Sequence, residues 1–138
     1  MANNYCRSSS FIHIKPEQKE RALEILAKIE AELLEDEDYG YAGFVAQFND
    51  ASDYGDSGLW IYEEESIVPE HLERLVKALV EELDLPGIIT CSWSYTCSKP
   101  RVDEFSGGAF AIMKGKDTIW VGDAYQAAKQ LMENELKA

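Results

Sequence analysis

The residues best suited to chemistry lie in one short segment that follows a predicted strand. It holds two cations, two carboxylates and two glycines, in the order Lys99, Arg101, Asp103, Glu104, Gly107 and Gly108. Cationic side chains and the exposed backbone N–H groups of a glycine-containing loop can together bind an anionic group. The alternative is a rigid β-bulge or crossover in which the charges pair with one another. In both cases we expect a carboxylate to hold Arg101.

Cys97 precedes these cations by two and four residues, and nearby positive charge lowers a thiol pKa. A Cys-dependent enzyme would also need a base, and the two histidines are His13 and His71. His13 could approach Cys97 if the strands that carry them pair, whereas His71 is expected on the solvent face of a helix. The simpler hypothesis is a buried, inert thiol, so we lean against an enzyme.

Acidic residues offer two further hypotheses. Asp50, Asp53 and Asp56 recur every third residue, but this spacing is not that of an EF-hand loop, and Asp is common in turns. No metal site or cofactor is therefore predicted. Acidic runs at 35–38 and 63–65 are most simply exposed ends of elements, or they imitate the phosphates of a nucleic acid.

The elements that must position these residues follow from hydrophobic periodicity. Residues 91–97 alternate between bulky side chains (Cys91, Trp93, Tyr95 and Cys97) and small hydroxylated ones, as in a strand. Two cysteines so far apart on one strand cannot bridge each other. Leucines and valines at helical spacing predict a helix at 69–84, opened by Pro69.

The complete pattern predicts a single α+β domain, residues 1–138. Strands are expected at 9–15, 43–49, 58–63 and 88–98, with helices at 16–36 and 69–84. The order β-α-β-β-α-β is that of a ferredoxin-like antiparallel sheet with both helices on one face. This core covers about 9–98. An extension of about 99–137 adds a hairpin, 108–114 with 117–121, and a helix at 124–136.

Aromatic residues should occupy the second face of this sheet. Phe11, His13, Trp60 and Tyr62 alternate with aliphatic residues on strands 9–15 and 58–63. Such a face can stack bases, bind a small ligand, receive a helix or bury itself in a dimer. We expect the C-terminal helix or a second subunit to cover it.

Charge and composition restrict the partners. The 138 residues carry 26 acids against 13 Lys and Arg, a net charge of −13 that disfavours nucleic acid and anionic lipid. No apolar run is long enough to cross a bilayer, and no secretion signal is visible. Three cysteines fit free thiols in a reducing compartment. We therefore expect a cytoplasmic protein.

The segment Cys97-Ser-Lys-Pro-Arg, followed by Glu104-Phe-Ser-Gly-Gly, resembles a family of small uncharacterised proteins met in bacteria, phages and other mobile elements. The resemblance covers about residues 57–121. The chain is also distantly similar to plasmid- and phage-borne ferredoxin-like domains. The resemblance implies a fold but no activity, cofactor or catalytic residue.

These observations favour a non-enzymatic binding or regulatory module. Its predicted surface combines the 99–108 loop with the aromatic residues Trp60, Tyr62, Trp93 and Tyr95. Its partner would be a protein or a small anionic ligand, and a homodimer is compatible with the sequence. A Cys97–His13 enzyme and an acidic nucleic-acid mimic that binds a basic protein are the alternatives.

Overall fold

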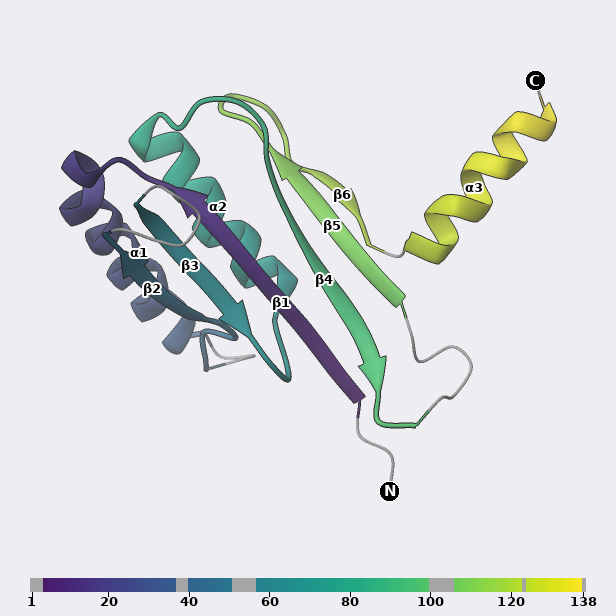
Figure 1. Ribbon diagram of the computed structural model, residues 1–138, viewed down its shortest axis with the longest axis horizontal. Helices are drawn as coiled ribbons and strands as arrows, with labels where there is room; N and C mark the ends of the chain where they lie inside the picture. Colours follow the sequence, from purple (N-terminus) through teal and green to yellow (C-terminus); the bar gives the residue numbers. More distant parts are fainter. Residues whose placement is uncertain (1–3, 37–39, 51–56, 100–105, 123, 138) are drawn as a thin grey trace.

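A computed structural model describes residues 4–36, 40–50, 57–99, 106–122 and 124–137. Within these residues the chain is an α+β protein with three α-helices and a six-stranded antiparallel sheet (Figure 1). The strands are β1 Asn4–His13, β2 Val45–Asn49, β3 Gly58–Glu63, β4 Ile89–Cys97, β5 Ser106–Ile112 and β6 Ile119–Val121. The helices are α1 Lys19–Leu34, α2 Pro69–Leu83 and α3 Ala124–Lys137, and a short 3-10 turn, Pro16–Gln18, precedes α1.

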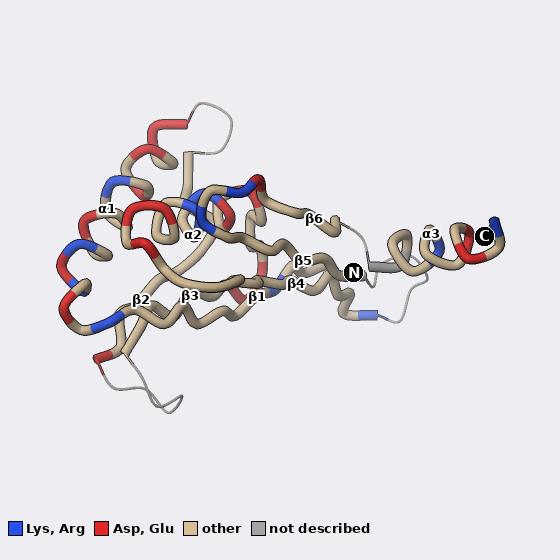
Figure 2. Tube along the Cα trace, turned by 90° about the horizontal axis from the view of Figure 1, so that it is seen from above, with Lys and Arg blue, Asp and Glu red and all other residues tan. Residues whose placement is uncertain are grey.

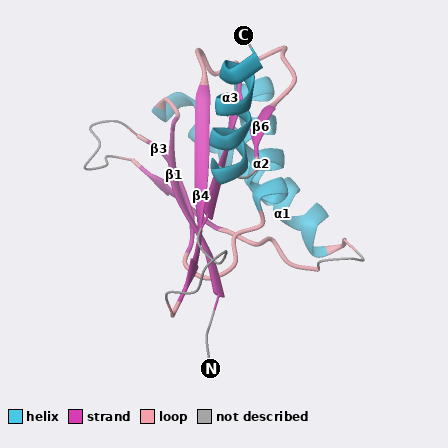
Figure 3. Ribbon diagram, turned by 90° about the vertical axis from the view of Figure 1, so that its right-hand side faces the viewer, coloured by secondary structure: helices cyan, strands magenta, loops and turns pink. Residues whose placement is uncertain are grey.

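The strands lie in the order β2-β3-β1-β4-β5-β6, and every neighbouring pair is antiparallel. Figure 3 shows α1 and α2 on the same side of this sheet. The other face carries no described helix. The antiparallel α+β class is therefore confirmed, and the extension adds β5 and β6 beside β4.

The sequence of α2 explains both its start and its packing. Pro69 occupies its first turn, where a missing N–H costs no hydrogen bond. Its buried residues recur at helical spacing and form one stripe: His71, Leu72, Leu75, Val76, Leu79, Val80 and Leu83. Asp84 then ends the helix with a left-handed backbone, φ 54° and ψ 48°.

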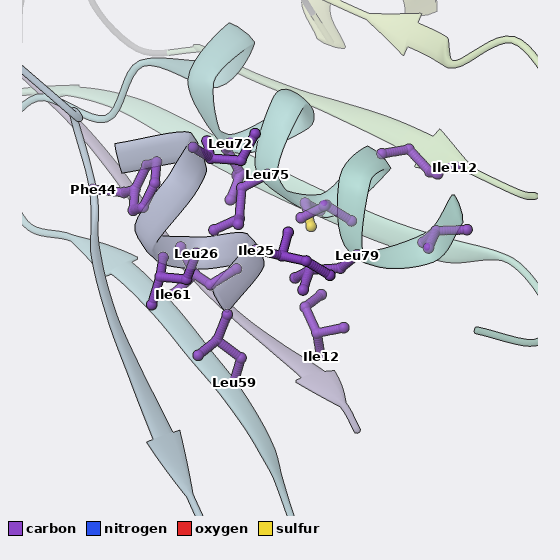
Figure 4. Close-up of a cluster of buried hydrophobic side chains, with 14 of the residues drawn as sticks. Ile12, Ile25, Leu26, Phe44, Leu59, Ile61, Leu72, Leu75, Leu79 and Ile112 are labelled. Carbon is purple, nitrogen blue, oxygen red and sulfur yellow. The ribbon is translucent and has the colours of Figure 1, made fainter. Parts of the chain in front are cut away.

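The core lies between this stripe, the matching stripe of α1 and the inner face of the sheet (Figure 4). Ile12, Leu59 and Ile61 are at most 2% exposed and contribute the sheet side. Cross-strand pairing joins Phe11 to Trp60, so the aromatic residues alternate away from these aliphatic ones. The predicted aromatic second face is confirmed.

The β5–β6 turn is fastened to α2 by polar contacts. The Gly115 N–H donates to Glu81 Oε1 at 3.0 Å, which lowers the pKa of that carboxyl. Thr118 Oγ1 donates to Glu73 Oε2 at 3.1 Å, and Lys114 pairs with Asp84 at 2.7 Å. The extension is thus held to the main body at this end.

The C-terminal helix corrects one expectation. Leu131, Met132 and Leu136 remain 70%, 63% and 80% exposed, so α3 does not cover the aromatic face. In Figures 1 and 2, α3 extends beyond the edge of the sheet, away from α1 and α2. Its apolar side chains therefore have no place in the core of their own chain.

Candidate functional site

A groove of about 400 Å³ lies on the helix-free face, across β3, β1 and β4. Six residues on these strands define what we call the open-face groove: Arg7, Ser9, Trp60, Tyr62, Ser92 and Ser94. Register explains their meeting, because Ser9 pairs with Tyr62 and Arg7 pairs with Ser94. Alternation on each strand then points all six side chains to one face.

An aromatic platform forms one side of the groove. The rings of Trp60 and Tyr62 are stacked, with centroids 4.1 Å apart and an interplanar angle of 27°. Trp60 Nε1 donates a hydrogen bond of 2.9 Å to Ser9 Oγ, which fixes the indole against β1. Both rings are half-buried and therefore keep surface available for a ligand.

The charges of the groove are asymmetric. Arg7 is exposed, its guanidinium lies 4.9 Å from the centroid of the Tyr5 ring, and it forms no ion pair with a described carboxylate. Glu63 and Glu64 lie on the rim. Glu63 Oε1 already accepts the backbone N–H groups of Glu64 and Glu65, at 3.0 and 3.2 Å. Arg7 is therefore the group most available to an anion.

The hydroxylated side of β4 forms the other wall. Ser92 and Ser94 are exposed beside the aromatic platform. Ser8 lies on β1 next to them, and its Oγ donates to the carbonyl of Ser92 at 2.7 Å. Small side chains on this wall leave the ring faces accessible, and their hydroxyls can donate or accept hydrogen bonds.

Trp93 and Tyr95 were predicted to share a surface with Trp60 and Tyr62. Trp93 does line the groove, but alternation points the side chains of Trp93 and Tyr95 to the other face of the sheet. The Trp93 side chain is 4% exposed and packs with Phe110 in the core, at a centroid distance of 6.1 Å. Its Nε1 has no hydrogen-bond partner among the described residues. Tyr95, on the same side of β4, pairs with Cys6 and is 39% exposed.

The predicted anion-binding loop is described only at its ends. Lys99 is exposed after β4, whereas Arg101, Asp103 and Glu104 lie outside the described residues. The carboxylate proposed to hold Arg101 stays a prediction for that reason.

The glycines of the same segment belong to β5, where Gly107 pairs with Ser94 and Gly108 with Trp93. A Cβ on Gly108 would lie 2.5 Å from Cζ2 of Trp93 and 2.6 Å from the carbonyl oxygen of Val121. A Cβ on Gly107 would lie 2.9 Å from the carbonyl oxygen of Trp93. Close packing therefore accounts for both glycines, and Gly108 in particular makes room for the Trp93 indole.

The two residues of the proposed Cys–His enzyme are far apart. Cys97 pairs with Asn4, whereas His13 lies nine residues further along β1, about 30 Å away at ~3.3 Å per residue. Strands β1 and β4 do pair, as that hypothesis required, but the antiparallel register places the two side chains at opposite ends. This pair therefore cannot act as a catalytic dyad.

The cysteines are unbridged, as predicted. Cys91 is 2% exposed, and burial raises the pKa of its thiol. Cys97 is only partly buried, so the prediction of a mostly buried thiol holds for Cys91 alone.

The second histidine and the aspartates that were considered as metal ligands are described only in part, and those described make contacts within the fold. His71, expected at the surface, is 5% exposed, and its Nδ1 donates to the Ala42 carbonyl at 2.7 Å. Asp50 pairs with Lys19 at 2.8 Å, and Asp53 and Asp56 lie outside the described residues. No cluster of metal-binding side chains occurs among the residues that the structure describes.

A larger cavity, about 770 Å³, lies near the C-terminal end of β1 and includes His13, Asp50 and Asp84. Both carboxylates are already paired, Asp50 with Lys19 and Asp84 with Lys114. Among the described residues that line this cavity, there is no stacked aromatic platform comparable to Trp60 and Tyr62. The open-face groove is therefore the stronger candidate.

Sequence reasoning identified the aromatic half of the groove but missed Arg7. The strand was predicted to start at residue 9, because serines at 8–10 conceal its hydrophobic alternation, whereas β1 starts at Asn4. The small hydroxylated face of residues 90–98 was the available signal for Ser92 and Ser94. Only the pairing register shows that this face adjoins Trp60.

Comparisons with family models, curated proteins and solved structures find no match for this chain. Within the described residues, every helix is too short or too polar to cross a membrane.

Proposed function

We propose that this chain is a small non-enzymatic binding module whose ligand site is the open-face groove. The observation that carries the proposal is the stacked Trp60–Tyr62 pair, held by Ser9, beside Arg7, which lacks a described carboxylate partner. Aromatic faces that recognise planar molecules, with a few polar groups that fix orientation, are typical of ligand sites.

The charges favour one class of ligand. Arg7 would bind a carboxylate-type anion, and its planar guanidinium suits bidentate contacts. Glu63 and Glu64 on the rim would repel a molecule with several phosphates. The ligand we propose is a planar aromatic molecule with a single negative charge.

Titration with benzoate, followed by amide and indole NMR shifts, tests the proposal, and benzyl alcohol serves as the uncharged analogue. We expect saturable benzoate shifts at Trp60 Nε1 and the groove amides, and weaker binding of benzyl alcohol. Trp60→Ala should abolish the saturable shifts. Arg7→Gln should weaken benzoate binding about tenfold or more, because hydrogen bonds to charged groups contribute roughly 1.5–3 kcal/mol.

Arg21→Gln is the matched control, because Arg21 is also exposed but lies on α1. It should bind benzoate like the unaltered chain. Saturable shifts that survive Trp60→Ala, or their absence in the unaltered chain, would reject the open-face groove as a site for this ligand class.

A second candidate function is an acidic surface that binds a basic protein, because the negative net charge is confined to one part of the chain. Residues 1–86 carry 20 acids against 7 Lys and Arg, whereas residues 87–138 carry 6 of each. Figure 2 shows acidic positions along α1 and α2. Competition between this chain and duplex DNA for a basic DNA-binding protein of the same host tests it. Competition should weaken steeply with salt.

For the fold and origin, we propose a ferredoxin-like unit, β1 to β4 with α1 and α2, to which β5, β6 and α3 are added. The order β2-β3-β1-β4 within the sheet supports it. Membership in the mobile-element family rests on the 97–108 segment. A cytoplasmic location is proposed from the three unbridged cysteines.

A further inference from the structure

The outer edge of β6 is apolar and unpaired among the described strands. Its three residues, Ile119, Trp120 and Val121, are uncharged and 69%, 41% and 40% exposed. Monomeric proteins usually protect a sheet edge by keeping it short, or with charges, proline or a covering element. β6 is short, with three residues, but it contains no charge and no proline. A second short strand can therefore pair with this edge.

Helix α3 presents a second unpartnered apolar surface. Leu131, Met132 and Leu136 lie on one stripe and are all more than 60% exposed. A 14-residue helix is marginal in water without tertiary packing. The described contacts of α3 with the sheet are chiefly with β5, and they leave this stripe uncovered. The helix needs a surface outside its own core.

A groove of about 320 Å³ offers such a surface at the other end of β6. Ile88, Met113 and Ile119 line it and are 69%, 44% and 69% exposed. It lies beside the β5–β6 turn, at the N-terminal end of β6. Helix α3 leaves from the C-terminal end of β6, so the groove and the helix are separated within one chain.

We propose that β6 and α3 form an interface with a second copy of this chain. If two β6 strands pair antiparallel, the C-terminal end of each lies beside the N-terminal end of the other. That arrangement brings each α3 to the groove of Ile88, Met113 and Ile119 on the partner copy. The same patch is used twice, as a two-fold symmetric interface requires.

The distribution of net charge makes the β6 edge the place where two copies of this chain repel each other least. Residues 1–86 have 13 more acids than bases, so two copies that met there would repel each other. Residues 87–138 have equal numbers of both. The opposite sheet edge, β2, belongs to the acidic part, and its exposed side chains include the polar Gln47. Two acidic chains can meet at β6 and α3 with least repulsion.

Sedimentation of the full chain over a range of protein concentrations tests the interface. We expect a reversible dimer of twice 15.6 kDa, and a melting temperature that rises with protein concentration. Leu131→Glu should weaken dimerisation at least tenfold, because it places a charge in an apolar contact. Leu34→Glu is the matched control: Leu34 is 60% exposed on α1, and this variant should dimerise unchanged.

Three results would overturn the inference. They are a monomer at all concentrations with a constant melting temperature, an open-ended oligomer, and equal dimerisation of both variants. A monomer would leave another protein as the occupant of the surface. If Leu131→Glu fails to fold, sedimentation and melting of the unaltered chain over the concentration range still show whether it dimerises. The outcome is independent of the open-face groove, because none of its six residues lies on β6 or α3.

Discussion

Residues 1–86 and residues 87–138 differ in their net charge and in how far they bury their apolar side chains. The first part buries its apolar side chains between two helices and a sheet, and it holds the entire net charge of −13. The second part adds Trp93, Phe110 and Ile112 to that core, but it is neutral overall and leaves apolar residues of β6 and α3 exposed. The first part also exposes apolar side chains, such as Leu34 at 60%, but they lie among its acidic residues. The proposed interface between two copies rests on this combination of apolar exposure and absent net charge.

Removing the same side chain in both regions should give the largest contrast. Leu79→Ala should destabilise the chain by about 2–5 kcal/mol, because Leu79 is 0% exposed and its loss leaves a cavity. Leu131→Ala should change the stability of the monomer by less than about 0.5 kcal/mol, because Leu131 is 70% exposed. Urea denaturation at concentrations where the chain is monomeric measures both. A loss of several kcal/mol for Leu131→Ala would mean that α3 is packed within its own chain.

A smaller effect should appear within residues 87–138, where β4, β5 and β6 pack against one another. Gly108→Ala should cost about 1–3 kcal/mol, because its Cβ would lie 2.5 Å from the Trp93 ring and 2.6 Å from the Val121 carbonyl oxygen. Gly122→Ala is the matched control, since no atom of the described residues beyond its chain neighbours lies within 4 Å of a Cβ there. The midpoint of urea denaturation compares the two variants. Equal stability would show that the β4–β5–β6 packing is looser than described.

Sequence reasoning predicted the elements well where one hydrophobic period dominates. The α2 stripe is the best case, and its start at Pro69 was predicted correctly. Strand β1 was predicted five residues too short at its start, because Arg7 and the three serines after it place polar residues on both faces and conceal the alternation. The pattern of α3 indicated a helix correctly, but amphipathicity does not identify the surface against which a helix packs.

The site was harder to predict than the fold. Trp60 and Tyr62 were placed on the correct face by alternation, whereas Trp93 and Tyr95 were assigned to the same surface although they lie across the sheet. Alternation defines two faces within a strand. It does not state which face of one strand continues onto the next, because pairing register decides that.

Hydrogen exchange of α3 tests the proposed association of residues 87–138 directly, because protection of a helix amide reports whether the helix is packed. At a concentration where the unaltered chain is dimeric, we expect protected α3 amides, with fast exchange in Leu131→Glu and unchanged protection in Leu34→Glu. Helix α2 should remain protected in all three proteins. If α3 amides exchange fast in the unaltered chain, or are equally protected in Leu131→Glu, the association of residues 87–138 through α3 is contradicted.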